Sequence, residues 1–319
     1  MTPPDAPTAV IALGGNALAP TGERSTIFDQ FRHARESLGP IVDLAHEGWN
    51  VCVVHGNGPQ VGDELLRNEV ARNEATPLPL GVLVAATAGW IGYMIQQSIE
   101  NALERIGSKR RVATVITQVE VRADDPALQD PSKFIGQPLS LERADELQRE
   151  GHVVKVDGRG QLRRVVGSPT PQAIHELETI RQLVEQGTLV VACGGGGAPI
   201  YRNVLKEWEG LDAVIDKDLA AAVLARDLGA KLLLILTDVD AVYADWGTPH
   251  QRAIPRLTVR EAERMDRAGA FGEGSMAPKV RAAIDFARRT GGRAIITVLS
   301  RGQDAVRGEA GTTITAETA

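Results

Sequence analysis

Two lysines lie where the start of a helix would disfavour them. Lys217 lies between Asp216 and Asp218 in "VIDKDLAAAVLA", at the predicted first turn of an alanine-rich helix, and Lys279 follows Pro278 in "GSMAPKVRAAIDFA". The helix dipole places partial positive charge at this end, so a cation there costs a few tenths to about 1 kcal/mol unless an anion lies beside it. Two such lysines favour a polyphosphate bound between them. For either lysine alone, pairing with neighbouring carboxylates or simple exposure explains the position equally well.

Glycine-rich turns follow several short apolar segments. These turns are "ALGGNAL", "VVHGNGPQVG" and "ACGGGGAPI", and the polar turn "LTDVDAVY" follows a further segment. In a parallel sheet, ligands bind outside the carboxyl ends of the strands, where glycine lets backbone N–H groups approach an anion. Asn16 and Asn57 adjoin glycines, at positions where an amide can bind an acid substrate or a transferring phosphoryl group. One such turn is explained by tight strand-to-helix connections alone, but four of them favour a common site.

Familiar nucleotide signatures are absent from the sequence. No stretch supplies G-x-x-x-x-G-K-[ST], and "GNGPQVG" places its third glycine one residue too late for G-x-G-x-x-G. The absence of these patterns excludes a standard P-loop NTPase and a Rossmann dehydrogenase.

His55 ends an apolar segment and is interpreted as a structural histidine rather than a phosphate contact. Trp90 and Tyr93 are interpreted as core or dimer-contact residues rather than a platform for a base.

The elements that must position these residues alternate along the chain. Buried strands are predicted at "TAVIAL", "VCVVHG", "VATVITQV", "TLVVACG", "AKLLLILTD" and "RAIITVLS", and helices are predicted over about 88–106 and 278–289. This alternation predicts a mostly parallel sheet covered on both faces. Residues 117–171 interrupt it with a polar, proline-punctuated segment and a hairpin that turns near Asp157 and Gly158. We therefore expect one domain over 1–319 with a lid-like subdomain inserted at 117–171.

Composition excludes several classes of partner. With 319 residues, 43 % hydrophobic content and a formal charge of −6, the chain can build a large core, but it has no excess of basic residues for nucleic acid or an anionic membrane. Cys52 and Cys193 are far apart and have no metal-binding spacing, so neither a disulfide framework nor a zinc site is indicated. The N-terminus lacks a signal-peptide pattern, and no apolar run reaches the length of a membrane span. A cytoplasmic protein with small-molecule ligands is expected.

The motifs together resemble those of a known family. In chain order, "ALGGNAL", "HGNGPQVG", "CGGGGAPI", "AVIDKD", "LTDVDAVY" and "GSMAPK" resemble the motif set of carbamate kinases, within the amino-acid kinase family. The segments "DPSKFIGQP" and "SPTPQAIHELETI" extend the resemblance over nearly the whole chain. It implies an α/β fold, a three-layer α/β/α sandwich around an open, mainly parallel sheet with a small protruding subdomain, assembled as a homodimer.

The resemblance also implies a role for individual residues. The turns expected to bind carbamoyl phosphate contain Gly14, Gly15, Asn16, Gly56, Asn57 and Gly58. Lys217 and Lys279 are similar to phosphate-binding lysines, Asp218 to the residue that holds them, and Lys133 to a lysine that reaches in from the subdomain. The nucleotide is expected at Gly195, Gly196, Asp238, Tyr243, Met276 and Lys279. No side chain is assigned to a metal.

The implied activity is reversible, Mg2+-dependent transfer of a phosphoryl group between carbamoyl phosphate and ADP. It yields ATP and carbamate, which decomposes to ammonia and carbon dioxide. Phosphoryl transfer requires alignment and positive charge, and the ionised carbamate oxygen needs no general base. Two alternatives remain open: a kinase of another small carboxylate or phosphate monoester, and a non-catalytic sensor of nucleotide or acyl phosphate, which has less need of three lysines.

One segment departs from the family pattern. Carbamate kinases typically carry G-R-G-W-R-[RK]-V-V-P-S-P, whereas this chain has "GRGQLRRVVGSP", with Gln161 and Leu162 in place of the tryptophan segment and Gly167 in place of a proline. The loss of the bulky ring and of the proline predicts a more mobile hairpin in the inserted subdomain.

Overall fold

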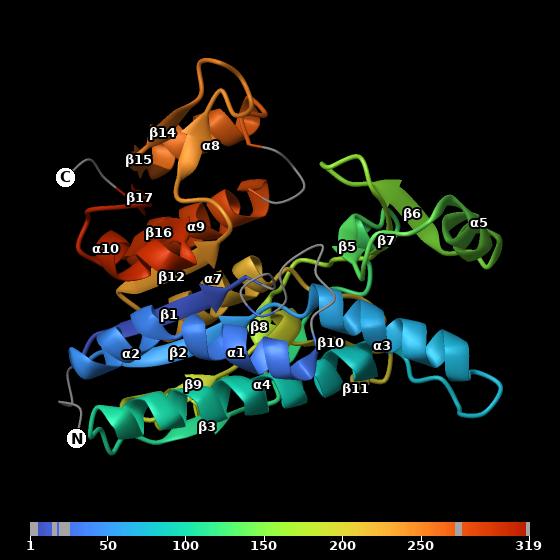
Figure 1. The fold of residues 1–319 in the computed structure, drawn as a ribbon, viewed down its shortest axis with the longest axis horizontal. Coiled ribbons are helices and arrows are strands. Elements are labelled where there is room, and N and C mark those ends of the chain that lie inside the picture. The colour runs from blue at the N-terminus through green and yellow to red at the C-terminus, as the bar shows by residue number, and fades with distance from the viewer. Residues whose placement is uncertain (1–5, 15–17, 19–25, 272–275, 317–319) are drawn as a thin grey trace.

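A large, mainly parallel sheet forms the centre of the molecule (Figure 1). The computed structural model describes residues 6–14, 18, 26–271 and 276–316. In spatial order the strands are β15 (Arg256–Thr258), β17 (Thr312–Thr315), β16 (Arg293–Val298), β12 (Leu232–Thr237), β1 (Thr8–Leu13), β2 (Asn50–His55), β9 (Leu189–Val191) and β3 (Val112–Thr114). Neighbouring strands are parallel except β16 and β17. The predicted fold class is thereby confirmed.

The sheet is covered by helices on both faces, which explains the continuous apolar character of its strands. On β1, Val10 and Ala12 lie in one apolar cluster while Ala9, Ile11 and Leu13 lie in the other. Strands buried on both faces have no polar side to alternate with. One cluster includes residues of α1 (Ile27–Glu36), α2 (Gly39–His46), α4 (Leu80–Arg105) and α10 (Gly302–Val306). The other includes residues of α6 (Leu177–Glu185), α7 (Lys217–Asp227), α8 (Val259–Arg267) and α9 (Met276–Thr290).

Two boundaries differ from the sequence prediction. The helix predicted from about residue 88 is α4, which begins at Leu80 after Pro79 at its N-cap. The apolar stretch before residue 88 shows no clear period, because exposed positions such as Val82 are apolar like the buried ones. The predicted strand "VATVITQV" is two strands: β3 closes the central sheet, and β4 (Gln118–Glu120) joins a second one.

Three smaller sheets complete the fold. One has the order β11 (Trp208–Gly210), β10 (Ala198–Arg202), β4 and β8 (Ala173–Ile174), and another pairs β13 (Val242–Ala244) with β14 (Arg252–Ile254). The third contains β5 (Lys133–Ile135), β7 (Leu162–Val166) and β6 (Val153–Val156), with α5 (Leu141–Arg149) beside it. Short 3-10 turns occur at Pro126–Leu128, Gly194–Gly196 and Leu299–Arg301.

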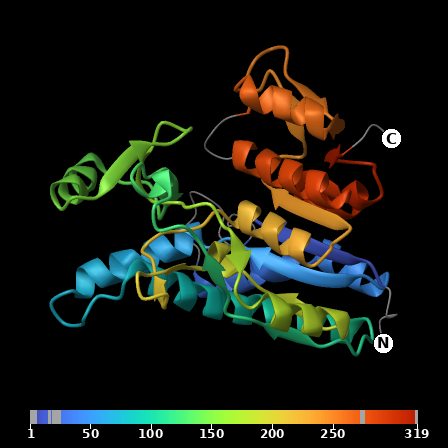
Figure 2. The same cartoon turned by 180° about the vertical axis from the view of Figure 1, so that it is seen from behind.

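The third sheet and α5 project from the main body on the side of α3 (Gly58–Ala71), as both views show (Figures 1 and 2). We call residues 133–166 the protruding subdomain. The predicted hairpin is confirmed within it, because β6 and β7 pair antiparallel up to Val156 and Leu162. Asp157 accepts the backbone N–H groups of Arg159 and Gln161 and so closes the turn.

Among the described residues, no helix is both long enough and apolar enough to cross a membrane. Cys52 and Cys193 are buried and free.

Candidate active site

Asp216 starts the helix that carries the first of the two unusual lysines. It is the N-cap of α7, and its Oδ1 accepts the backbone N–H groups of Asp218 at 2.9 Å and Leu219 at 3.3 Å. Such a cap satisfies donors that the first helical turn leaves unpaired. Lys217 is therefore the first residue of the helix, as the sequence predicts, and it is almost completely buried there.

Asp218 joins the starts of two helices. Lys217 Nζ donates to Asp218 Oδ1 at 2.5 Å, and Lys279 Nζ, in the first turn of α9, donates to Asp218 Oδ2 at 3.1 Å. Only 2 % of the Asp218 side chain is exposed. The structure thus brings together the three side chains that the sequence singles out at these helix starts.

A third lysine reaches the same place from the protruding subdomain. Lys133 Nζ, at the start of β5, donates to Asp216 Oδ2 at 2.5 Å across 83 residues of sequence. We call Lys133, Asp216, Lys217, Asp218 and Lys279 the lysine cluster. Three lysines against two aspartates give it a formal charge of +1, which suits an anionic ligand.

Burial and pairing compete in the lysine cluster. Burial alone would raise the pKa of Asp218, but Lys217 and Lys279 hold that pKa below its usual value; Lys133 acts likewise on the pKa of Asp216. For Lys279, the nearby carboxylates outweigh burial and raise the pKa. For Lys217, burial dominates and lowers the pKa despite Asp218. Lys217 is therefore the cation that an incoming anion would stabilise most.

The glycine turn after β9 packs closely against neighbouring turns. Gly195 and Gly196 have φ values of +69° and +91°, which side chains rarely adopt. A Cβ at Gly195 would lie 2.2 Å from Asn57 Nδ2, and one at Gly196 would lie 2.3 Å from the carbonyl oxygen of Ile215, the residue before Asp216. The turn therefore connects the region of Asn57 with the start of α7.

The predicted substrate turns lie together at the carboxyl ends of β1 and β2. Gly14 N–H donates to the carbonyl of Leu236, and Gly56 N–H donates to the carbonyl of Leu13. Asn57 is the N-cap position of α3 and Gly58 its first residue, while Asn57 Nδ2 donates to Thr87 Oγ1 of α4 at 2.9 Å. Gly15 and Asn16, predicted in the same turn as Gly14, lie outside the described residues.

His55 is a buried part of this framework. Its Nδ1 lies 3.0 Å from the carbonyl oxygen of Gly56, to which it can donate. Burial lowers the pKa of His55 to about 4, with a smaller contribution from the charge on Lys217. A neutral, enclosed imidazole agrees with the structural interpretation of this residue.

Two of the predicted nucleotide residues lie beside the lysine cluster, at the end of β12 and the start of α9. Asp238 directly follows β12 and contributes to the raised pKa of Lys279, while Met276 begins α9 and packs partly buried on the core. Tyr243 on β13 donates from its hydroxyl to Asp240 Oδ1 at 2.7 Å. Its ring contacts Trp246 edge to face, with centroids 5.2 Å apart.

Three residues that contact predicted ones are not among the sequence predictions. Asp216 adjoins Lys217 in the sequence, and the pair of acids around that lysine is a usable signal. Thr87 gives no sequence signal, because its partner Asn57 lies 30 residues away. Trp246, which is 60 % exposed beside Tyr243, is visible in the sequence as an aromatic residue within a polar loop.

The lysine cluster by itself offers two carboxylates to a metal ion. Among the described residues, no group of three or more histidine, cysteine or acidic side chains is placed to hold an ion. Mg2+ is usually bound through one or two carboxylates and substrate phosphates, and the buried carboxylates of Asp216 and Asp218 fit that arrangement.

Comparisons with known proteins agree with this geometry. The model of the amino acid kinase family matches residues 7–297. The carbamate kinase of Halobacterium salinarum is 48 % identical over 309 residues, covering 96 % of this chain and 97 % of that protein. The carbamate kinase of Pyrococcus horikoshii is 43 % identical over 309 residues, covering 96 % and 98 %. The structure of Giardia lamblia carbamate kinase bound to AMP-PNP superposes with a TM-score of 0.89 at 36 % identity, covering 98 % and 99 %. This chain therefore belongs to the amino acid kinase family and, within it, to the carbamate kinases.

Proposed function

We propose that this protein transfers a phosphoryl group reversibly between carbamoyl phosphate and ADP, giving ATP and carbamate, which decomposes to ammonia and carbon dioxide. The observation that supports it best is the lysine cluster, where three ammonium groups meet two buried carboxylates beside the ends of β1, β2 and β12. The names of the relatives and the AMP-PNP bound to the Giardia lamblia enzyme support the choice of substrates.

The chemistry expected of the cluster is electrostatic. Lys217 and Lys279 present positive charge to the oxygens of the transferring phosphoryl group, and Asp218 fixes both ammonium groups before the substrate arrives. Such preorganised charge does not need to reorient in the transition state. Lys133 adds a third charge from the protruding subdomain, which acts as a lid. The ionised carbamate oxygen needs no base, and a buried His55 with a pKa of about 4 is not required to supply one.

The remaining roles are proposed from the resemblance of the motifs to those of the family. The turns at Gly14, Gly56, Asn57 and Gly58, with Gly15 and Asn16, bind carbamoyl phosphate. The nucleotide lies along Gly195, Gly196, Asp238, Tyr243 and Met276. Asp216 and Asp218 would hold Mg2+ together with the nucleotide phosphates, and the ion would supply neutralising charge there. We further propose a homodimer in a cytoplasmic, reducing setting, which the two free buried thiols suit.

The test is a coupled assay for ATP formed from ADP, Mg2+ and carbamoyl phosphate. Robust ATP formation is expected, with acetyl phosphate a much poorer donor because it lacks the amino group. Excess chelator should abolish the activity, because uncompensated phosphate charge then remains. Equal rates with both donors would overturn the carbamate assignment, and full activity in chelator would overturn the role of Mg2+.

A further inference from the structure

The protruding subdomain is attached to α3 at two points far apart along the helix. Near the start of α3, the N–H of Gly136 donates to the carbonyl of Gly58 at 3.0 Å. Gly62 also lies against Gly136 so closely that a Cβ built on Gly62 would be 2.0 Å from Gly136 Cα. Ile135 is buried there in an apolar cluster with Val61 of α3. This first contact forms the base of the subdomain.

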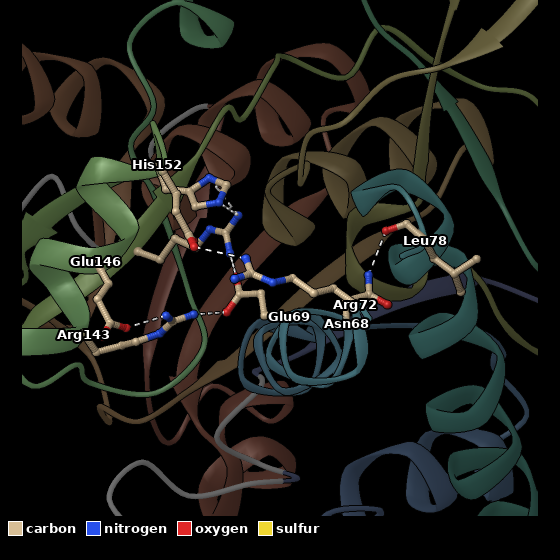
Figure 3. Close-up of polar contacts among 9 residues, drawn as sticks. Asn68, Glu69, Arg72, Leu78, Arg143, Glu146 and His152 are labelled. Carbon is tan, nitrogen blue, oxygen red and sulfur yellow. Dashed lines mark hydrogen bonds and ion pairs between the residues drawn. The ribbon is translucent and has the colours of Figure 1, made fainter. Parts of the chain in front are cut away.

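The second attachment, near the end of α3, is ionic. Arg72, the C-cap residue of α3, forms an exposed ion pair with Glu150 of the subdomain at 3.2 Å, and a more buried carboxylate binds two arginines. Glu69 accepts Arg164 of β7 through Oε1 at 2.6 Å and Arg143 of α5 through Oε2. Figure 3 shows Glu69 on α3 between Arg143 and the side of the subdomain that carries His152. Since Glu69 is the twelfth residue of α3, about 16 Å of helix separates it from Gly58 at ~1.5 Å per residue.

Removing this carboxylate would leave like charges facing α3. The Glu69 side chain is 21 % exposed, and those of Arg164 and Arg143 are 16 % and 30 % exposed, so solvent screens the group only in part. Arg143 has a second partner in Glu146 at 2.8 Å, but Arg164 otherwise faces the imidazole of His152. Two guanidinium groups that converge on one acid repel each other once that acid is lost. Because the Arg72–Glu150 pair is mostly exposed and such pairs contribute little, Glu69 is the main ionic link that keeps this end of the subdomain on α3.

The orientation of the subdomain affects the lysine cluster through Lys133, which lies two residues from Ile135 at the base of the subdomain. Lys133 and Ile135 lie on the same strand, and β7 pairs with that strand so that Arg164 is opposite Ile135 and Val166 is opposite Lys133. Two residues of strand span about 7 Å. A rotation of roughly 10° about the base at Ile135 would therefore move the Lys133 backbone by about 1 Å, and misplacement on that scale can cost about 100-fold in rate.

We infer that Glu69 is a positioning residue: by binding Arg143 and Arg164 at once, it holds the protruding subdomain on α3 in the orientation that presents Lys133 to the transferring phosphoryl group. The effect of Glu69 on the reaction rests on the proposed function, whereas its role in holding the subdomain on α3 does not.

The kinetic test compares Glu69→Gln with Glu64→Gln. Glu64 lies on the same helix and pairs with Arg67 of α3 rather than with the subdomain. Glu69→Gln is expected to lower kcat at least ~10-fold with little change in the KM for ADP, whereas Glu64→Gln keeps wild-type kinetics. In a Lys133→Ala background, Glu69→Gln should cause no further loss, because both changes act on the same lysine. Equal rates for the two glutamine variants, or a full additional loss in the Lys133→Ala background, would overturn the inference.

Gly62→Ala tests the same orientation from the base of the subdomain. Alanine favours a helix over glycine, so α3 itself should not suffer, but the added Cβ would displace Gly136. The same fall in kcat is expected, again absent when Lys133 is already alanine. A Gly62→Ala protein with wild-type kcat would contradict the coupling between subdomain orientation and Lys133.

Pulsed electron paramagnetic resonance separates this inference from the proposed function. Spin labels at Asp145→Cys on α5 and Glu104→Cys on α4 report the subdomain position, because Cys52 and Cys193 are buried. One narrow distance distribution is expected in the otherwise native protein and in Glu64→Gln, and a broader, shifted one in Glu69→Gln. If the protein forms no ATP, the proposed function fails while this measurement still decides the holding role. An unchanged distribution in Glu69→Gln overturns that role.

Discussion

At the scale of single residues, Asp218 links the first turns of α7 and α9 by pairing with Lys217 and Lys279. The dipole of each helix alone favours removal of its lysine. The geometry changes this expectation, because Asp218 is only 2 % exposed and would lose a direct partner with either substitution. A buried carboxylate that is left undercompensated costs far more than an unfavourable helix-end charge.

We predict that Lys217→Ala lowers the free energy of unfolding by about 3–5 kcal/mol and that adding Asp218→Asn restores a large part of it. Urea unfolding of both variants measures this. The exposed Lys231→Ala is the matched control and should change stability by no more than about 0.5 kcal/mol. The rate of ATP formation should fall about 100- to 1000-fold in Lys217→Ala through the loss of preorganised charge. A Lys217→Ala protein of wild-type stability would contradict the buried pairing.

His55 makes the stability of the protein sensitive to mild acid. Its pKa is about 4 in the folded protein, below the ordinary value near 6.5, so the unfolded chain takes up a proton first as the pH falls. Stability is then fully present above about pH 6.5 and is lost down to about pH 4, by at most about 3 kcal/mol. The lowered pKa values of Asp216 and Asp218 remove further stability only below the ordinary range of aspartate near 4.

Urea unfolding between pH 7 and 4.5 measures the His55 contribution. His55→Asn should flatten the pH dependence of stability, whereas His46→Asn, at an exposed site, should leave it unchanged. If the slope between pH 6.5 and 5 is the same in His55→Asn as in the native protein, another group is responsible.

At the scale of elements, the turn after β9 is shaped by contacts that tolerate no side chain. Gly195 has φ +69°, and the side-chain amide of Asn57 occupies the space where a Cβ would lie. Asn57 in turn donates to Thr87 of α4. A change in this turn is therefore transmitted to the start of α3, where substrate binding is proposed.

We predict that Gly195→Ala lowers the free energy of unfolding by about 2–4 kcal/mol, from the left-handed backbone and the clash with Asn57. It should also raise the KM for carbamoyl phosphate, because Asn57 must move. Thermal unfolding and steady-state kinetics test the two effects. Gly210→Ala, where nothing lies within 4 Å of a Cβ, is the control. A KM that stays at the wild-type value would show that Asn57 does not take part in binding carbamoyl phosphate.

At the scale of the whole molecule, one face of α4 leaves apolar side chains exposed. Val82 is 47 % and Tyr93 56 % exposed on this helix, and Ile116, beside it across a surface hollow, is 46 % exposed. Helical spacing places Val82, Ala86, Gly89 and Tyr93 along one stripe. This face is our candidate for the contact of the proposed homodimer.

Sedimentation velocity tests this assembly. A species of about twice the 34.1 kDa chain mass is expected for the native protein, and a single-chain species for Tyr93→Asp, because a buried, unpaired carboxylate opposes the contact. Leu141→Asp, a change at a more exposed apolar residue on the protruding subdomain, should remain dimeric. If the Tyr93→Asp protein is still a dimer, the dimer contact lies on another face.

The sequence alone determined those features whose causes are local. Continuous apolar segments predicted the buried strands, because a strand covered on both faces has no polar positions. Glycines at strand ends and lysines at helix starts predicted where the candidate site lies, since backbone approach and the helix dipole act within a turn. The full extent of α4 was not predicted, because its first turns carry apolar residues on the exposed face as well as on the buried one, so no clear period appears.

Only the tertiary structure decided which charges meet. Lys133 pairs with Asp216 rather than Asp218, and Glu69 receives arginines 74 and 95 residues further along the chain. Charged residues on a helix or an inserted loop look alike in sequence, because most of them are simply solvated. Their partners depend on how the protruding subdomain lies on α3, and that orientation is fixed by packing between distant segments, with Gly62 against Gly136 at its base.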